Sequence, residues 1–205
     1  MSLRRVHLAT ACLLLIFILA HIANHLGALG GVANHLAVMD ILRLAYRNIV
    51  VETILLAAFA FQVVIGLRLL LRAKSNVSGL VGWAQLLSGG YLAFFVTVHV
   101  GAVLSGRMIL GLDTNFWFAV AGYSAGILKL WFTPYYFLSV LALFVHLGCA
   151  AYWLTGARKP VSQYWFMALA IAGAVISTLI STALMGGFED FEVPARYLEP
   201  YSAFL

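Results

Sequence analysis

Histidine is the residue type whose chemistry and position most need an explanation in this sequence. The chain has 205 residues, of which 64% are hydrophobic, 9% are charged and 6 are histidines. An ionisable side chain at membrane depth is costly unless it has a partner, so histidines in such a chain indicate binding of a metal, a cofactor or one another. Four of them fall inside long apolar runs: His21, His25, His99 and His146. His21 and His25 are one helical turn apart and therefore share a helix face.

The apolar runs that must position these histidines are long enough to cross a bilayer. A helical crossing needs about 20 residues, and five runs reach that length: 8–29, 49–71, 83–104, 134–154 and 164–185. A sixth run, 116–128, is too short, and we expect it to form an interfacial helix between the third and fourth spans. The sequence therefore predicts an all-α integral membrane bundle of five transmembrane helices in one domain, residues 1–205. Its first span is expected to be retained and not cleaved as a signal peptide.

Depth in the membrane pairs two of these histidines. His21 lies roughly 20 Å from the inner start of the first span, and His99 lies roughly 24 Å from the inner start of the third. The two spans run in the same direction, so both imidazoles are expected in the outer half of the bilayer, where one ligand can bridge them. His146 and Gln62 match in depth on the fourth and second spans. This second pair lacks one iron ligand, because glutamine binds iron poorly, whereas the imidazole of histidine binds it well.

Haem is the first candidate for a ligand between two imidazoles on apolar helices, because it is flat and apolar and its iron accepts one imidazole on each face. Zinc needs three or four protein ligands, and neither Cys12 nor Cys149 falls at this level. A proton relay needs an acid beside the histidine, and the only acid near a span is Glu52. Hydrogen bonds from each histidine to a neighbouring helix remain as a further explanation. We expect His7 and His35 at the surface or beside haem propionates.

Charged residues predict a topology for the bundle. With the N-terminus in the cytoplasm, 7 basic residues face inward and 5 face outward, which agrees with the positive-inside rule. The inner group is Arg4, Arg5, Arg68, Arg72, Lys74, Arg158 and Lys159, and the outer group is Arg43, Arg47, Arg107, Lys129 and Arg196. The net charge of +5 is spread between apolar runs, so it indicates membrane-flanking charge and no nucleic-acid partner. Arg107, with Arg43 and Arg47, can offer a bidentate fork to a haem propionate.

Short blocks of the sequence resemble the five-helix, single-subunit cytochrome b membrane anchor of succinate dehydrogenases and fumarate reductases. The blocks are spread over nearly the whole chain: Arg4-Arg5-Val6-His7; His21 and Asn24; Glu52, Gln62 and Gly66; Ser88-Gly89, His99, Arg107, Gly111 and Asn115-Phe116; His146; and Pro160-Val161-Ser162-Gln163. Gln62 stands where the second helix of the family carries a haem-binding histidine.

The resemblance implies specific haem ligands. In the two-haem members of the family, histidines of the first and third helices hold an outer haem, and histidines of the second and fourth hold an inner one. Carried over, His21 and His99 would bind the iron of an outer haem b, with His25 as the alternate ligand on the first helix. His146 would face an inner haem that lacks its opposite ligand at Gln62. The second haem is then lost, bound through one imidazole or held by another ligand.

The resemblance also implies partners. Flavoprotein and iron–sulfur subunits would dock on the cytoplasmic face, a membrane quinone would be the substrate, and no dicarboxylate active site would lie on this chain. We expect the chain in a prokaryotic cytoplasmic membrane. Two alternatives stay open: a stand-alone haem b quinol oxidoreductase, and a non-redox membrane transporter or scaffold. A transporter is expected to show broken helices in two related halves, and the sequence does not divide in that way.

Overall fold

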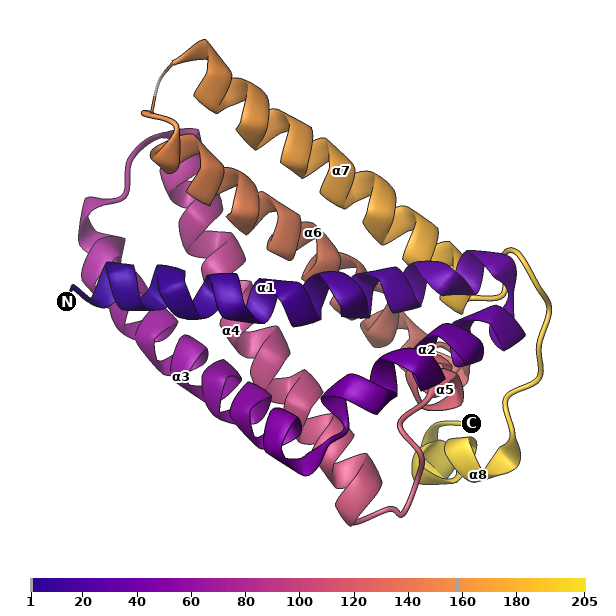
Figure 1. Ribbon diagram of the computed structural model, residues 1–205. Coiled ribbons are helices and arrows are strands. Elements are labelled where there is room, and N and C mark those ends of the chain that lie inside the picture. Colours follow the sequence, from indigo (N-terminus) through magenta and orange to yellow (C-terminus); the bar gives the residue numbers. More distant parts are fainter. Residues whose placement is uncertain (1, 158) are drawn as a thin grey trace.

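The computed structural model describes residues 2–157 and 159–205. It is 86% helical with no strands in the described part, and five helices are long and apolar enough to cross a membrane. They are Leu3–Gly30, Ile49–Ala73, Gly79–Met108, Gly126–Leu154 and Pro160–Leu184. The predicted five-helix, all-α membrane bundle is therefore confirmed, and the chain is a multi-pass membrane protein (Figure 1). Arg158, assigned above to the inner group of basic residues, lies outside the described residues.

Long helices alternate with short elements along the chain. The spanning helices are α1 (Leu3–Leu26, continued by the 3-10 turn η1, Gly27–Gly30), α3 (Ile49–Ala73), α4 (Gly79–Met108), α6 (Lys129–Leu154) and α7 (Pro160–Leu184). The shorter elements are α2 (Val32–Tyr46), α5 (Phe116–Ser124), α8 (Ala195–Leu198), η2 (Lys74–Asn76), η3 (Gly126–Leu128) and η4 (Glu199–Phe204).

Most short elements gather at one end of the bundle, which we call the cap. The cap contains η1, α2, α5, α8 and the C-terminus, whereas the N-terminus and the α3–α4 and α6–α7 connections lie at the opposite, N-terminal end (Figure 1). The acidic residues all belong to cap elements or to helix ends beside the cap: Asp40, Glu52, Asp113, Glu189, Asp190, Glu192 and Glu199. The basic residues described at the N-terminal end are exposed: Arg4, Arg5, Arg68, Arg72, Lys74 and Lys159. The acidic residues thus lie only toward the cap, whereas basic residues lie at both ends of the bundle.

Several helices extend beyond the apolar runs that predicted them. α1 begins at Leu3, where the Ser2 hydroxyl accepts a hydrogen bond from the Arg5 N–H at 3.4 Å and caps the helix. α6 begins at Lys129, so Pro134 lies inside this helix and not at its start as expected. An apolar run marks only the part of a helix that contacts lipid. The backbone hydrogen bonds of the helix continue beyond that run to the residue that caps it, so the helix is longer than the run. Pro160 occupies the first turn of α7, where its missing N–H costs nothing.

Helix α2 is the main element that the apolar runs did not predict. It has 15 residues, but Asp40, Arg43 and Arg47 keep this stretch from being read as a span. Of the two places expected for His35, the surface and the side of haem propionates, the first is wrong, because His35 lies on α2 with only 1% of its surface exposed. Contacts from other helices bury it, and an amino-acid pattern along one helix does not report such contacts.

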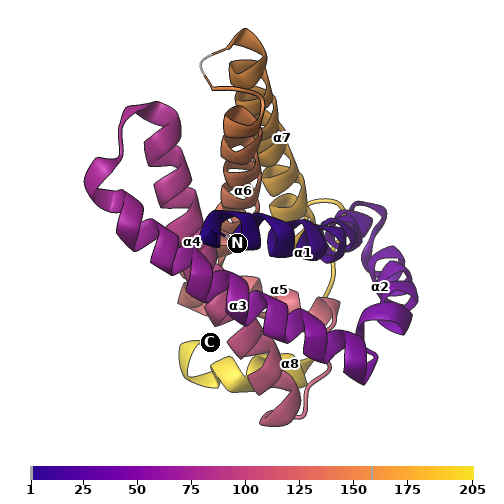
Figure 2. The ribbon, with the colours of Figure 1, turned by 60° about the vertical axis from the view of Figure 1, so that its left-hand side comes forward.

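Helices α6 and α7 form the most closely packed pair in the bundle. They lie side by side along their length (Figure 2). Small residues allow this approach: the position of a Cβ on Gly148 lies 3.1 Å from the Phe166 carbonyl oxygen, and Gly173 faces the Phe144 side chain. Small residues at helix crossings are the usual means of close packing in membranes, where lipid provides no hydrophobic drive between helices.

The other three spans are packed more openly. In the most apolar window of α6 and of α7, 33% of residues are buried, against 6% in α3 and 11% in each of α1 and α4. α1 packs on α3, α3 packs on α4 and α4 packs on α6, and α7 contacts α1 and η1 where these elements meet at the cap (Figure 1). Side chains of α1 and α4 therefore have to cover the space between these two helices.

The largest hydrophobic core lies in the cap and not in the middle of the bundle. Helix α5 is at its centre: Phe116, Val120 and Ala121 have at most 1% of their surface exposed. Within the short run 116–128, only α5 forms a separate helix, which ends at Ser124 and is too short to span a membrane, as predicted. Protein encloses α5, whereas Gly126 and Ile127 at the start of the next spanning helix are exposed. The Glu189 carboxylate accepts a 2.6 Å hydrogen bond from the Val32 N–H, which joins the segment after α7 to the start of α2.

Packing between α6 and α7 yields a stability prediction. Gly173→Leu is expected to lower the unfolding free energy by about 1–3 kcal/mol, because the new side chain must displace Phe144. Gly101→Leu is the matched control on a span, since nothing lies within 4 Å of its Cβ position. Denaturant titration of both variants in detergent micelles measures the difference. Equal unfolding midpoints for the two variants would show that the α6–α7 contact is not tight.

Candidate functional site

The structure brings together the two histidines that depth had paired. His21 on α1 and His99 on α4 have ring centroids 6.0 Å apart and ring planes at 61°. Phe17 stacks on His21 at 5.7 Å and 17°, and Phe95 stacks on His99 at 5.1 Å and 13°. Each imidazole thus stacks on a phenylalanine of its own helix, which restricts rotation of the ring.

The separation of these rings matches a shared metal ion. A metal that binds one nitrogen of each ring at about 2 Å holds the two ring centroids roughly 6 Å apart, and the observed value is 6.0 Å. No group of three or more His, Cys, Asp or Glu side chains in residues 2–157 and 159–205 is arranged to hold a metal ion. A pair of imidazoles therefore suits, by its chemistry, a metal that brings further ligands of its own, as haem iron does.

Two further imidazoles continue from His21 toward the cap. His25 lies 4.7 Å from His21 between ring centroids, and their Nε2 atoms are 3.3 Å apart. His35 lies 5.5 Å from His25 between ring centroids and 5.1 Å from Phe116. Burial, followed by the charges of His21 and Arg43, lowers the pKa of His35 to about 4, so this ring is neutral at pH 7. The sequence predicted that His21 and His99 meet here. In the structure, His25 and His35 extend this pair to a row of four imidazoles.

Gln62 contacts α1 through both ends of its amide. The Thr10 hydroxyl donates to the Gln62 Oε1 at 2.5 Å, and the Gln62 Nε2 lies 3.3 Å from the Nε2 of His7. The His7 ring rests on α3 beside Gly66, where a Cβ would lie 3.3 Å from its Cε1. His7 is thus part of a polar group inside the bundle and not the surface residue that was expected.

His146 on α6 is held in a similar way. Its Nδ1 lies 3.2 Å from the Ser88 hydroxyl of α4, and a Cβ on Gly89 would lie 3.1 Å from its Cε1. His7 is close enough to His146 for their charges to interact. The imidazole brought near His146 is therefore His7, whose role the sequence did not predict. A signal existed: His7 and His21 are 14 residues apart, close to four helical turns, so they lie on nearly the same side of α1.

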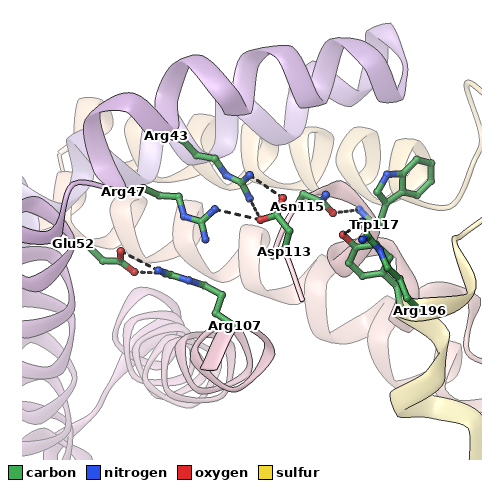
Figure 3. A network of polar contacts seen from close by, with 9 residues as sticks. Arg43, Arg47, Glu52, Arg107, Asp113, Asn115, Trp117 and Arg196 are labelled. Carbon is green, nitrogen blue, oxygen red and sulfur yellow. Dashed lines mark hydrogen bonds and ion pairs between the residues drawn. The ribbon is translucent and has the colours of Figure 1, made fainter. Parts of the chain in front are cut away.

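The predicted propionate-binding arginines pair with acidic residues of the chain itself. Arg43 forms a bidentate contact with Asp113 at 2.9 and 3.1 Å, and Arg47 binds the same carboxylate at 3.2 Å (Figure 3). Arg107 binds both carboxylate oxygens of Glu52. Burial of Asp113 opposes its ionisation, but the hydrogen bonds and charges of Arg43 and Arg47 outweigh burial and lower its pKa.

These ion pairs fasten the cap to the bundle. Arg43 and Arg47 on α2 hold Asp113 in the connection after α4, and Glu52 at the start of α3 holds Arg107 near the end of α4. The next residues of that connection lead into α5, where the Asn115 side chain accepts from the Trp117 N–H at 3.0 Å and caps the helix (Figure 3). The elements that carry His35 and His99 are thus fixed relative to each other by charge.

Comparisons with known proteins return no match: no protein-family model, no curated protein and no solved structure is similar to this chain.

The contact between α3 and α4 can be tested by a double-mutant cycle. Glu52→Gln and Arg107→Gln are each expected to lower the unfolding free energy by about 1–2 kcal/mol, because each leaves a partly buried charge without its partner. The double variant should recover part of that loss, since neither charge then remains. Denaturant titration gives the coupling energy, with the exposed Asp40→Asn as a control on α2. Strictly additive losses would show that the two side chains act independently.

Proposed function

We propose that this chain is the haem b membrane anchor of a complex of the succinate dehydrogenase and fumarate reductase type. In this proposal His21 and His99 would hold a haem through its iron, and the chain would pass electrons between a partner iron–sulfur subunit and membrane quinone. The observation that carries the proposal is the 6.0 Å separation of the two rings on α1 and α4. The sequence blocks that resemble the anchor family support it independently.

The residues around the site fit an apolar macrocycle. Aromatic rings of Phe17 and Phe95 stack against the two imidazoles, and the openly packed half of the bundle surrounds them. When bound, haem would supply a one-electron redox centre. The contribution of the chain is to orient the imidazoles, to exclude water and to set the low dielectric that tunes a redox potential.

The inner polar group is proposed as the side of the bundle that meets the quinone. His7, Gln62, Ser88 and His146 offer neutral hydrogen-bonding groups and no carboxylate. Such groups match the two carbonyl oxygens of an uncharged, lipid-soluble ring better than they match an ion. The Gln62 amide is already bonded to Thr10 and His7, which supports one haem per chain and not two.

The N-terminal end is proposed as the docking face for the flavoprotein and iron–sulfur subunits, with that end in the cytoplasm. Its described charges are basic and exposed, whereas all seven acidic residues lie at or beside the cap. Such an asymmetry is the one that the positive-inside rule relates to orientation. Co-purification of both subunits with the tagged chain supports this assignment. A lone cytochrome would instead support the stand-alone quinol oxidoreductase.

Ligand assignment is tested by the optical spectrum of the purified protein. His21→Ala and His99→Ala are each expected to abolish the reduced-minus-oxidised spectrum of low-spin haem b, because six-coordination needs both imidazoles. Thr97→Ala is the matched control on α4, since its hydroxyl only bonds the Ala93 carbonyl of the same helix. Retention of the wild-type spectrum in either histidine variant would refute the assignment.

The number of haems per chain tests whether the inner polar group, which consists of His7, Gln62, Ser88 and His146, binds a second haem. The wild-type chain is expected to bind one haem, and Gln62→His is expected to raise the ratio toward two by supplying a second imidazole on α3. Pyridine haemochrome analysis against protein concentration measures the ratio, with Gln62→Asn as the control that keeps an amide. Two haems in the wild type, or an unchanged ratio in Gln62→His, would contradict this account of the inner group.

A further inference from the structure

A polar cluster at the cap end of α1 is not explained by iron binding. It consists of Asn24, His25 and His35, and only 4% of Asn24 and 1% of His35 are exposed. The Nδ2 of Asn24 lies 3.3 Å from the Nε2 of His35, and the His25 and His35 rings are 5.5 Å apart. Two of these side chains come from α1 and one from α2, so the fold assembles the cluster.

The helix α2 is fixed so that His35 enters this cluster. The Asn34 side chain donates to the Gly27 carbonyl at 2.6 Å, next to the turn that joins the helices. Gly27 lies under His35, with 3.6 Å between its Cβ position and the His35 Cα. The tetrapeptides 23–26 and 33–36, both Ala-Asn-His-Leu, thus face each other across the turn.

Three polar atoms of the cluster are buried without a hydrogen-bond partner: Asn24 Oδ1, His25 Nδ1 and His35 Nδ1. A buried polar atom that is left unpaired destabilises the folded state. The Asn24 Nδ2 can only donate, so the His35 Nε2 accepts from it, and the single proton of the neutral ring sits on Nδ1. His35 therefore directs an unpaired N–H donor into the interior of the protein.

His25 supplies a second unpaired ring nitrogen. Its Nε2 lies 3.3 Å from the Nε2 of His21, whereas its Nδ1 is buried without a hydrogen-bond partner. A proton on Nδ1 makes this atom a second N–H donor in the cluster. His25 is next to the iron ligand on the cap side, at 4.7 Å between ring centroids.

We propose that His25 and His35, oriented by Asn24, bind the propionate groups of the haem. The inference rests on the proposed function, since it requires a haem between His21 and His99. Two imidazole N–H donors would each donate to a propionate carboxylate, a charge-assisted hydrogen bond that is stronger than a neutral one. His25 is in this account a propionate partner and not the alternate axial ligand.

The arginines are the competing candidates for this role, and their contacts disfavour them. Arg43 and Arg47 share the Asp113 carboxylate, and Arg107 holds Glu52. A propionate bound by any of them would have to displace an existing ion pair. The imidazole cluster has unpaired polar atoms and requires no such exchange.

The test is redox-difference infrared spectroscopy of the full chain reconstituted with haem that carries ¹³C at both propionate carboxyls. Isotope-sensitive carboxylate bands are expected to shift in His35→Leu, which removes the donor while keeping an apolar side chain of similar size. The bands should move back toward wild type in His35→Gln, which restores an N–H donor. Arg43→Gln tests the competing arginine, and Asp40→Asn, at an exposed position of α2, is the control that should leave the bands unchanged.

A redox titration of the same samples gives a second readout. His35→Leu should keep the low-spin, six-coordinate spectrum but lower the midpoint potential by about 59 mV, a tenfold change in a one-electron equilibrium. The potential falls because an uncompensated propionate charge favours ferric iron.

Each contrary result has a defined meaning. Wild-type protein that binds no haem refutes the proposed function itself. Haem-loaded His35→Leu with unchanged bands and potential refutes only this inference and leaves the cluster to buried water. Band shifts in Arg43→Gln but not in His35→Leu would assign the propionates to the arginines, and loss of six-coordination in His25→Ala would return His25 to the iron. Either of these results overturns the propionate assignment.

Discussion

The need to pair polar side chains inside a membrane is the constraint on which this structure depends. Hydrocarbon offers no hydrogen bonds, so a polar group at membrane depth must find its partner on another helix. The spans meet this need with small groups that join different helices. Gln62 joins α3 to His7 and Thr10 of α1, and Ser88 joins α4 to His146 of α6. The rings of His21 and His99 meet between α1 and α4.

Two kinds of packing support these groups. The pair α6 and α7 is close-packed through small residues such as Gly148 and Gly173, so these two helices form the tightly packed side of the bundle. Helices α1, α3 and α4 bury a smaller share of their residues, and the polar groups lie between them. The cap closes this half: its core is built around Phe116, and its ion pairs tie α2 and α3 to the end of α4. The close-packed pair α6 and α7 on one side, and the cap at one end, thus position α1 and α4, which carry His21 and His99.

Much of the fold was readable from the sequence, because span length and composition follow directly from bilayer thickness. The proximity of His21 and His99 was also predictable, since helix rise converts sequence position into depth. The burial of His35 was not, because it depends on α2 folding back under Phe116, a contact between segments far apart in the chain. Arg107 was correctly placed near the end of its span, but its partner Glu52 is on another helix. For His7, helical periodicity along α1 carried a usable signal, whereas its contact with Gln62 required the relative placement of two helices.

Near-infrared magnetic circular dichroism of the purified, oxidised protein tests the central claim most directly, because the position of its charge-transfer band reports the two axial ligands of ferric haem. The account predicts one low-spin haem b per chain with the band of two neutral histidine ligands. A protein that stays free of haem when haem is supplied during expression, or a band that reports any other ligand pair, would contradict it.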